Sequence, residues 1–116
     1  MKVKIGEDLI SPGTYDAELK GIVTIKGTDK NNLFLEFGLI NGRVVRGWLA
    51  SSTGNEFRVE IKNSQRWIAA LLGRETRQGE EVDLEKLVGR ACRVVVVHER
   101  RKGIIYANVK EVLPKT

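Results

Sequence analysis

The sequence has few of the residues that build metal sites, disulfides or catalytic centres. Its 116 residues include one Cys, Cys92, and one His, His98. A single Cys excludes a disulfide within the chain, and one Cys with one His makes neither a zinc site nor a nucleophile–base pair. The sequence also lacks a glycine-rich phosphate loop and a nucleophile elbow. We therefore expect no enzymatic activity, no metal site and no cofactor.

Long apolar runs are also absent. No stretch approaches the roughly 20 apolar residues that a helix needs to cross a bilayer. The first ten residues, MKVKIGEDLI, carry charges and have no apolar core of the kind found in signal peptides. The two Pro are too few for a disordered or polyproline-rich chain. We therefore expect a cytoplasmic protein with no membrane partner.

Positive charge is what the sequence has in excess. It holds 20 Lys and Arg against 15 Asp and Glu, a net charge of +5. A basic surface favours a polyanionic partner, although it says nothing about the fold. The hydrophobic and charged fractions, 41% and 30%, are typical of a globular chain. Its length predicts a single domain over residues 1–116 with a modest core.

Residues 32–50, NLFLEFGLINGRVVRGWLA, predict a β-hairpin. The pair Asn41-Gly42 favours a tight two-residue turn, because both central positions of that turn need a positive φ. Alternation places the aliphatic residues on the inner face and Phe34, Arg46 and Trp48 on the outer face. A flat ring beside a guanidinium suits an unstacked base and its phosphate. The alternative is that the two rings form a cross-strand pair, or pack under a loop or a neighbouring subunit.

The segments around this hairpin predict a strand before it and a helix after it. Residues 14–26 alternate as a strand, and Gly21 within them marks a bulge or bend that lets one strand serve both halves of a barrel. Residues 56–62 alternate too, as an extension of the third strand or as an extra one. Ser64 is a good N-cap for a helix over residues 65–72, whose apolar stripe makes Trp67 a core residue.

The C-terminal part predicts two more strands. Asp83 caps a short helical segment that ends at Gly89. Residues 90–98 then form a strand whose faces are both largely apolar, which predicts partial cover on both sides. Residues 99–103, ERRKG, are a tight turn, and residues 104–113 are the last strand.

This order of elements predicts an all-β fold. Five strands with a helix between the third and fourth follow the order of the OB-fold, a five-stranded Greek-key barrel. Its usual binding surface is the outer face of strands two and three with the one–two and four–five loops. The expected nucleic-acid-binding residues are the aromatic and basic side chains on these elements: Lys26, Lys30, Phe34, Arg43, Arg46, Trp48, Arg100, Arg101, Lys102 and Tyr106.

Short segments across most of the chain resemble a known class of protein. Residues 12–15 (PGTY), 64–72, 87–94 (LVGRACRV) and 106–109 (YANV), with Leu113-Pro114, look like the small single-domain OB-fold proteins of phage and prophage replication or recombination modules. The resemblance implies binding of single-stranded DNA. Many single-strand binders end in an acidic tail that recruits partners, whereas this sequence ends in LPKT, so recruitment through a tail is not expected.

Two functions are compatible with these features. The first is largely sequence-independent binding of single-stranded DNA or RNA, with phosphates neutralised by Lys and Arg and bases stacked on the rings. The residues do not distinguish DNA from RNA. The alternative is an OB-fold assembly subunit of a phage or replication complex, without nucleic-acid binding, whose outward apolar side chains such as Val44, Val95 and Val97 contact protein. A homo-oligomer, or contact with replication or recombination proteins, is compatible with both.

Overall fold

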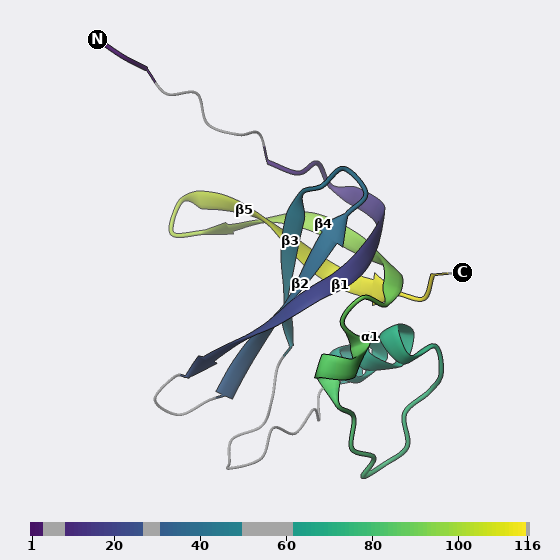
Figure 1. Cartoon of the computed structure of the whole chain (residues 1–116). Helices are drawn as coiled ribbons and strands as arrows, with labels where there is room; N and C mark the ends of the chain where they lie inside the picture. The colour runs from purple at the N-terminus through teal and green to yellow at the C-terminus, as the bar shows by residue number, and fades with distance from the viewer. Residues whose placement is uncertain (4–8, 27–30, 50–61, 116) are drawn as a thin grey trace.

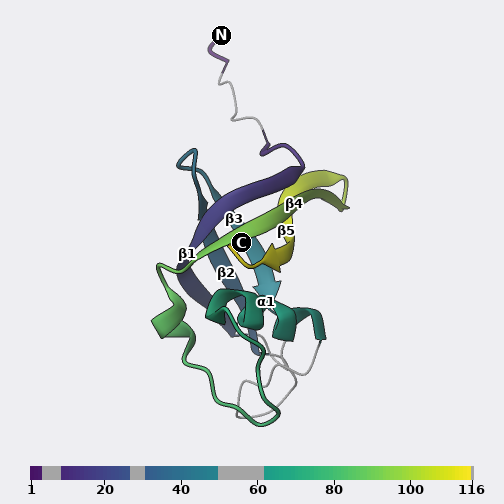
Figure 2. The same cartoon turned by 90° about the vertical axis from the view of Figure 1, so that its right-hand side faces the viewer.

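The computed structural model describes residues 1–3, 9–26, 31–49 and 62–115 (Figure 1). Within these ranges five strands close into a barrel in the order β1-β2-β3-β5-β4. The strands are β1 (Gly13–Lys26), β2 (Asn31–Leu39), β3 (Val44–Leu49), β4 (Ala91–Arg101) and β5 (Ile104–Leu113). Helix α1 (Lys62–Leu72) and the 3₁₀-helix η1 (Leu84–Leu87) come between β3 and β4 in sequence, and both lie below the barrel (Figure 2).

Strand β1 takes part in both halves of the barrel. Its first part pairs antiparallel with β4 and its second part pairs antiparallel with β2. The β1–β2 register shifts between Leu19 and Gly21, which leaves Lys20 as an extra residue. Such a bulge bends a strand and lets it pass from one neighbour to the next. The predicted bend at Gly21 is confirmed.

The turn between β2 and β3 differs from the prediction. The Leu39 N–H donates to the Arg43 carbonyl at 2.8 Å, and the Gly42 N–H donates to the Leu39 carbonyl at 2.9 Å. The loop therefore has three residues, 40–42, of which Gly42 has a φ of 83°. The predicted two-residue turn is wrong, because it would pair Leu39 with Val44 and put the aliphatic faces of the two strands on opposite sides of the sheet.

The apolar core fills the barrel and continues into α1. The predicted inner face of the β2–β3 hairpin is confirmed, since Leu35, Phe37 and Leu49 are fully buried. Trp67 on α1 closes the lower end of the barrel and is 7% exposed, as predicted for a core residue. Its ring packs so tightly on Gly47 that a Cβ there would lie 2.7 Å from Trp67 Cζ3. A side chain at position 47 would therefore displace the indole.

The ends of the helices confirm the prediction in part. α1 begins at Lys62, so Ser64 is a buried residue of its first turn and not the predicted N-cap. Gly73, with a φ of 78°, follows α1 as expected for a residue that ends a helix. The Asp83 side chain accepts from the Glu85 N–H at 3.1 Å and caps η1 as predicted. No helix in the described ranges is long and apolar enough to span a membrane.

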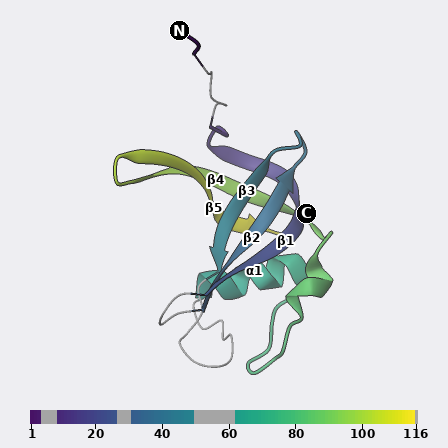
Figure 3. The same ribbon diagram turned by 60° about the vertical axis from the view of Figure 1, so that its left-hand side comes forward.

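The β4–β5 hairpin extends beyond the barrel (Figure 3). β4 continues to Arg101, and the two-residue turn Lys102-Gly103 has positive φ at both positions, 52° and 79°. The tight turn with positive φ at both central residues is therefore Lys102-Gly103, which is shorter than the turn predicted over residues 99–103. β1 covers β4 only as far as Val96, whereas β5 pairs with it to Arg101. Residues 27–30 of the predicted loop 27–31 and residues 56–61 of the strand-like segment 56–62 lie outside the described residues. Asn31 belongs to β2 and Lys62 begins α1, so the predictions are wrong at these two residues.

Candidate nucleic-acid interface

An aromatic pair stands on the outer face of β2 and β3. Phe34 and Trp48 are register partners across the two strands, and their rings are in contact at an interplanar angle of 51°. The cross-strand pair that the sequence left open therefore forms. Trp48 is nevertheless 38% exposed, whereas Trp67 is buried. An indole that rests on a second ring and faces solvent is a platform on which a base can stack.

A cation lies beside this pair. The Arg46 guanidinium is 5.8 Å from the centre of the Phe34 ring, which is within cation–π range. Arg46 also lies 3.0 Å from a carboxylate oxygen of Glu36, its register partner on β2. Both side chains reach solvent, so this ion pair contributes little to stability. The guanidinium has five N–H donors, and the Glu36 carboxylate occupies only some of them.

The same face continues onto β5 and β4. Asn108 on β5 is the register partner of Arg46, and partners in register point to the same side of a sheet. Asn108 Nδ2 donates to Glu99 Oε2 at 3.2 Å, and Arg101 Nη2 lies 3.4 Å from the same oxygen. Tyr106 is the register partner of Glu99 and is 44% exposed. We call this continuous surface the outer wall: Phe34, Glu36, Arg46, Trp48, Glu99, Arg101, Tyr106 and Asn108.

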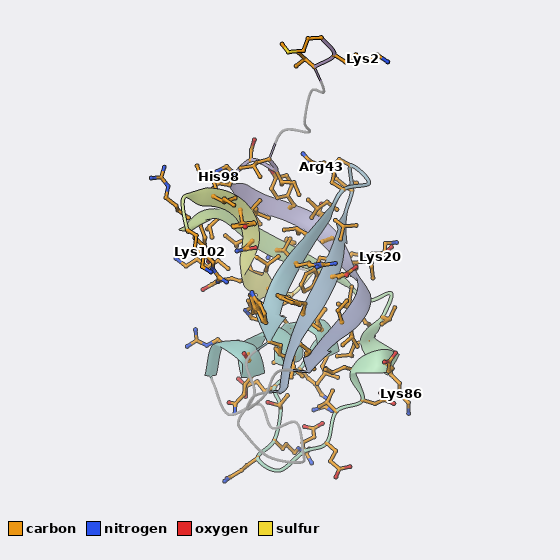
Figure 4. The ribbon with its side chains drawn as sticks, turned by 90° about the vertical axis from the view of Figure 1, so that its left-hand side faces the viewer. Lys2, Lys20, Arg43, Lys86, His98 and Lys102 are labelled. Carbon is orange, nitrogen blue, oxygen red and sulfur yellow. The ribbon has the colours of Figure 1, made fainter. Side chains whose placement is uncertain are left out.

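The three consecutive cations of the β4–β5 hairpin do not all lie on one face. Arg100 and Arg101 belong to β4, where successive side chains point to opposite faces. Arg101 therefore shares the outer wall with Glu99, and Arg100 points to the other side of the hairpin. Lys102 is at the tip (Figure 4). Among the described residues, Arg100 and Lys102 make no ion pair.

The remaining predicted cations lie at the ends of the wall or outside the described residues. Arg43 is at the β2–β3 turn, where its N–H donates to Asn41 Oδ1 at 2.9 Å. Figure 4 shows Arg43 at the top of the β2–β3 hairpin and Lys102 at the tip of the other hairpin. Lys26 is the last residue of β1, and its side chain is outside the described part, as is all of Lys30.

Three members of the outer wall were not predicted as site residues. Alternation places Glu36 two residues after Phe34 on the same outer face, which is the signal that could have included it. Glu99 and Asn108 join the wall through the β4–β5 register and the single β3–β5 pair, neither of which the sequence pattern shows. The wall therefore carries two carboxylates beside Arg46 and Arg101, whereas the predicted site residues were only basic or aromatic.

A cleft of about 560 Å³ lies elsewhere, between α1 and the end of β5. Its charged lining is mixed, with Arg66 and Arg74 beside Glu75 and Glu111. Arg74 donates two hydrogen bonds to the Glu80 carboxylate, with N–O distances of 3.1 and 2.5 Å. These bonds lower the pKa of Glu80 to about 2. The cleft contains none of the predicted site residues.

Cys92 and His98 have structural positions. Cys92 is 1% exposed, and burial raises the pKa of its thiol to about 11. His98 Nε2 lies 2.8 Å from the carbonyl of Ile10, which ties the segment before β1 to the base of the β4–β5 hairpin. In the described ranges, His, Cys, Asp and Glu do not gather in groups of three or more that could hold a metal ion.

The sequence was also compared with known proteins. No protein-family model and no curated protein matches it.

Proposed function

We propose that this chain is an OB-fold protein that binds single-stranded nucleic acid on its outer wall. Four features of the barrel support the OB-fold: the order β1-β2-β3-β5-β4, the sharing of β1 between two neighbours, the parallel contact of β3 with β5, and the helix between β3 and β4 in sequence. In this fold the outer face of strands two and three is the usual place for a single strand. The resemblance to phage and prophage replication proteins favours DNA over RNA.

The observation that carries the proposal is the exposed indole of Trp48. Burying an indole is favourable, and the chain does bury Trp67, yet it leaves Trp48 at the surface against Phe34. A base that stacks on such a ring contributes about 1–3 kcal/mol, and stacking accepts every base because each has a π-face. Tyr106, further along the wall, offers another exposed ring besides the Phe34–Trp48 pair.

The cations supply the other half of the interaction. Arg46 stands beside the rings, Arg101 is on the wall, and Lys102 is at the tip of the adjacent hairpin. Guanidinium groups bind phosphate through paired charge-assisted hydrogen bonds. Neutralised phosphates release counterions, so the affinity falls steeply with rising salt. Arg43, at the β2–β3 turn, extends this proposed path, and Lys26 and Lys30 stay predictions because their side chains lie outside the described part.

Binding is tested by the fluorescence anisotropy of a labelled single-stranded oligonucleotide at low and high salt. We expect Trp48→Ala to weaken binding about 5- to 150-fold, the equivalent of about 1–3 kcal/mol. Trp48→Phe keeps a ring and should lose less. Lys86→Ala, which removes a charge on η1 at the lower right of Figure 4, is the matched control and should bind like the wild type apart from a small change in overall charge.

Two results would contradict the proposal. If the unmodified protein binds no single strand at low salt, the function is wrong. If Trp48→Ala and the triple variant Arg100→Ala/Arg101→Ala/Lys102→Ala both bind like the wild type, the assignment of the site is wrong.

A second function, assembly with other proteins, is favoured by the β4–β5 hairpin. Ile104 and Ile105 at its end are 55% and 42% exposed, and as consecutive strand residues they point to opposite faces. Ile104 shares a face with Tyr106, which is 44% exposed, and neighbouring exposed apolar side chains favour contact with protein. Light scattering that shows a defined oligomer, together with no binding of nucleic acid at low salt, would favour this function over the first.

A further inference from the structure

We infer that the outer wall distinguishes bases with an exocyclic amino group from thymine, through the carboxylates of Glu36 and Glu99. This inference rests on the proposed binding of a single strand to the wall. The residue pattern alone predicts sequence-independent binding, whereas the structure leads us to expect a base preference.

The two carboxylates belong to one row of side chains that crosses four strands. Glu36 on β2 pairs with Arg46 on β3 at 3.0 Å. Arg46 is in register with Asn108 on β5, which donates to Glu99 on β4 at 3.2 Å. We call these four residues the polar row. Each member has a partner within the row, which holds the two carboxylates in place on the surface.

The polar row runs beside the rings on which bases would stack. Glu36 follows Phe34 by two positions on β2, and Arg46 precedes Trp48 by two positions on β3, a spacing of about 7 Å along each strand. Glu99 is the direct neighbour of Tyr106 across the β4–β5 pair. A base that stacks on Tyr106 or on the Phe34–Trp48 pair would therefore lie next to a carboxylate.

The two carboxylates repel phosphate groups but can accept hydrogen bonds from the donors on base edges. An ionised carboxylate only accepts hydrogen bonds, and it has room for about four. In the described part of the chain, donors reach Glu99 at Oε2, and no donor contacts its other oxygen. The N4 amino group of cytosine donates to carboxylates, whereas thymine carries the O4 acceptor at the equivalent position. Thymine offers only its N3–H donor, which stands between two carbonyl acceptors, so Glu99 would favour cytosine over thymine.

Cytosine and thymine are the cleanest pair for a test, because both are pyrimidines with similar stacking faces. The anisotropy experiment is run at neutral pH and low salt with oligo-dC and oligo-dT of equal length. We expect the wild type to bind oligo-dC at least about fivefold more tightly, the lower end of the discrimination that one good base contact provides. Glu99→Ala should bring the two affinities close together and strengthen the binding of oligo-dT, because it removes a repulsive charge.

Matched variants separate this effect from a change in overall charge or in folding. Glu85→Ala removes an exposed acid from η1, outside the wall, and should change both affinities by the same factor. Glu36→Ala should reduce the preference as Glu99→Ala does. Glu99→Gln keeps the size of the side chain, and circular dichroism of each variant reports whether the barrel is intact.

The possible failures are distinguishable. Equal binding of oligo-dC and oligo-dT by the wild type would overturn this inference and leave the proposed function standing. A preference for oligo-dC that survives in both Glu36→Ala and Glu99→Ala would also overturn it, because the carboxylates would then not be its source. Absence of binding to either strand would overturn both the inference and the proposed function.

Discussion

The two tryptophans of this chain lie on opposite sides of β3. Trp67 packs against the inner side of the strand, over Gly47, and is 7% exposed. Trp48, the next residue along β3, projects from the outer side and is 38% exposed. The first is an internal part of the core. The second is half covered by Phe34 and open to a ligand, so one short strand separates the core from the candidate site.

This arrangement shows how the barrel leaves the candidate binding face free of core packing. Because α1 inserts Trp67 from below, Gly47 needs no side chain of its own to fill the lower end of the barrel. The neighbours of Gly47 on β3, Arg46 and Trp48, point to the outer side of the strand and take no part in the core. Substitutions on the two sides of β3 should therefore have separable effects, on stability for the inner side and on binding for the outer side.

The sharpest contrast is between alanine substitutions of the two tryptophans. Trp67→Ala leaves a large cavity at the end of the barrel and should cost about 3–5 kcal/mol of unfolding free energy. Trp48→Ala loses mainly the ring pair with Phe34, which is worth about 0.5–1.5 kcal/mol. Urea denaturation followed by circular dichroism measures both. Equal losses for the two variants would contradict the division of roles.

A smaller effect is expected at Gly47. In Gly47→Ala the new Cβ would lie 2.7 and 2.9 Å from two ring atoms of Trp67 and 3.1 Å from Val109 Cβ. Overpacking of this kind costs about 1–3 kcal/mol. Gly21→Ala is the matched control, because nothing lies within 4 Å of a Cβ at that position.

The rescue of Gly47→Ala identifies its cause. Trp67→Phe shortens the ring that a Cβ at position 47 would meet, so the double variant should be more stable than the sum of the two single losses predicts. Denaturation midpoints of the four proteins give the coupling. Additive losses would mean that the Trp67 ring is not what position 47 contacts.

Solvent access to the two indoles should differ as well. With Trp48 as the only tryptophan, in Trp67→Phe, emission should be red-shifted and strongly quenched by acrylamide. With Trp67 alone, in Trp48→Phe, emission should be blue-shifted and quenched weakly, because the ring is buried. The reverse order would place Trp48 in the core and remove the basis for the proposed binding site.

The smallest effect concerns Cys92, which shares the interior with Trp67. Burial raises the pKa of its thiol from 9.0 to about 11. In the unfolded chain the thiol ionises first as the pH rises, so its contribution to stability is complete below 9.0 and is lost as the pH approaches 11. The difference in unfolding free energy between the wild type and Cys92→Ala should change over this range. No change would mean that the thiol is not shielded from water.

Much of the fold could be predicted because alternation assigns side chains to faces. The inner face of β2, the bend at Gly21 and the burial of Trp67 all follow from short-range patterns. Short-range patterns did not show which of the two hairpins has the two-residue turn. Asn41-Gly42 has the better dipeptide for a two-residue turn, yet the apolar faces of β2 and β3 match only with a three-residue loop. The two-residue turn formed instead at Lys102-Gly103.

The site was predicted less completely than the fold. Phe34, Arg46 and Trp48 are on one strand pair, and alternation alone places them together. Which of Arg100 and Arg101 reaches the wall depends on where β4 ends, and that end is set by the turn. The contact between Glu99 and Asn108 depends on the register of β4 with β5. No local pattern contains this long-range register, so Glu99 could not be assigned to the wall, whereas Glu36 was left out although alternation places it on the same face as Phe34.

The central claim is that a single strand binds on the Trp48 side of β3. Each of the two indole N–H groups gives its own signal in a ¹⁵N-correlated NMR spectrum, and Trp48→Phe and Trp67→Phe assign them. On titration with a short single-stranded DNA, the Trp48 signal should shift or broaden progressively while the Trp67 signal stays in place. Movement of the Trp67 signal alone, or of neither signal under conditions where binding is measured, would contradict the account.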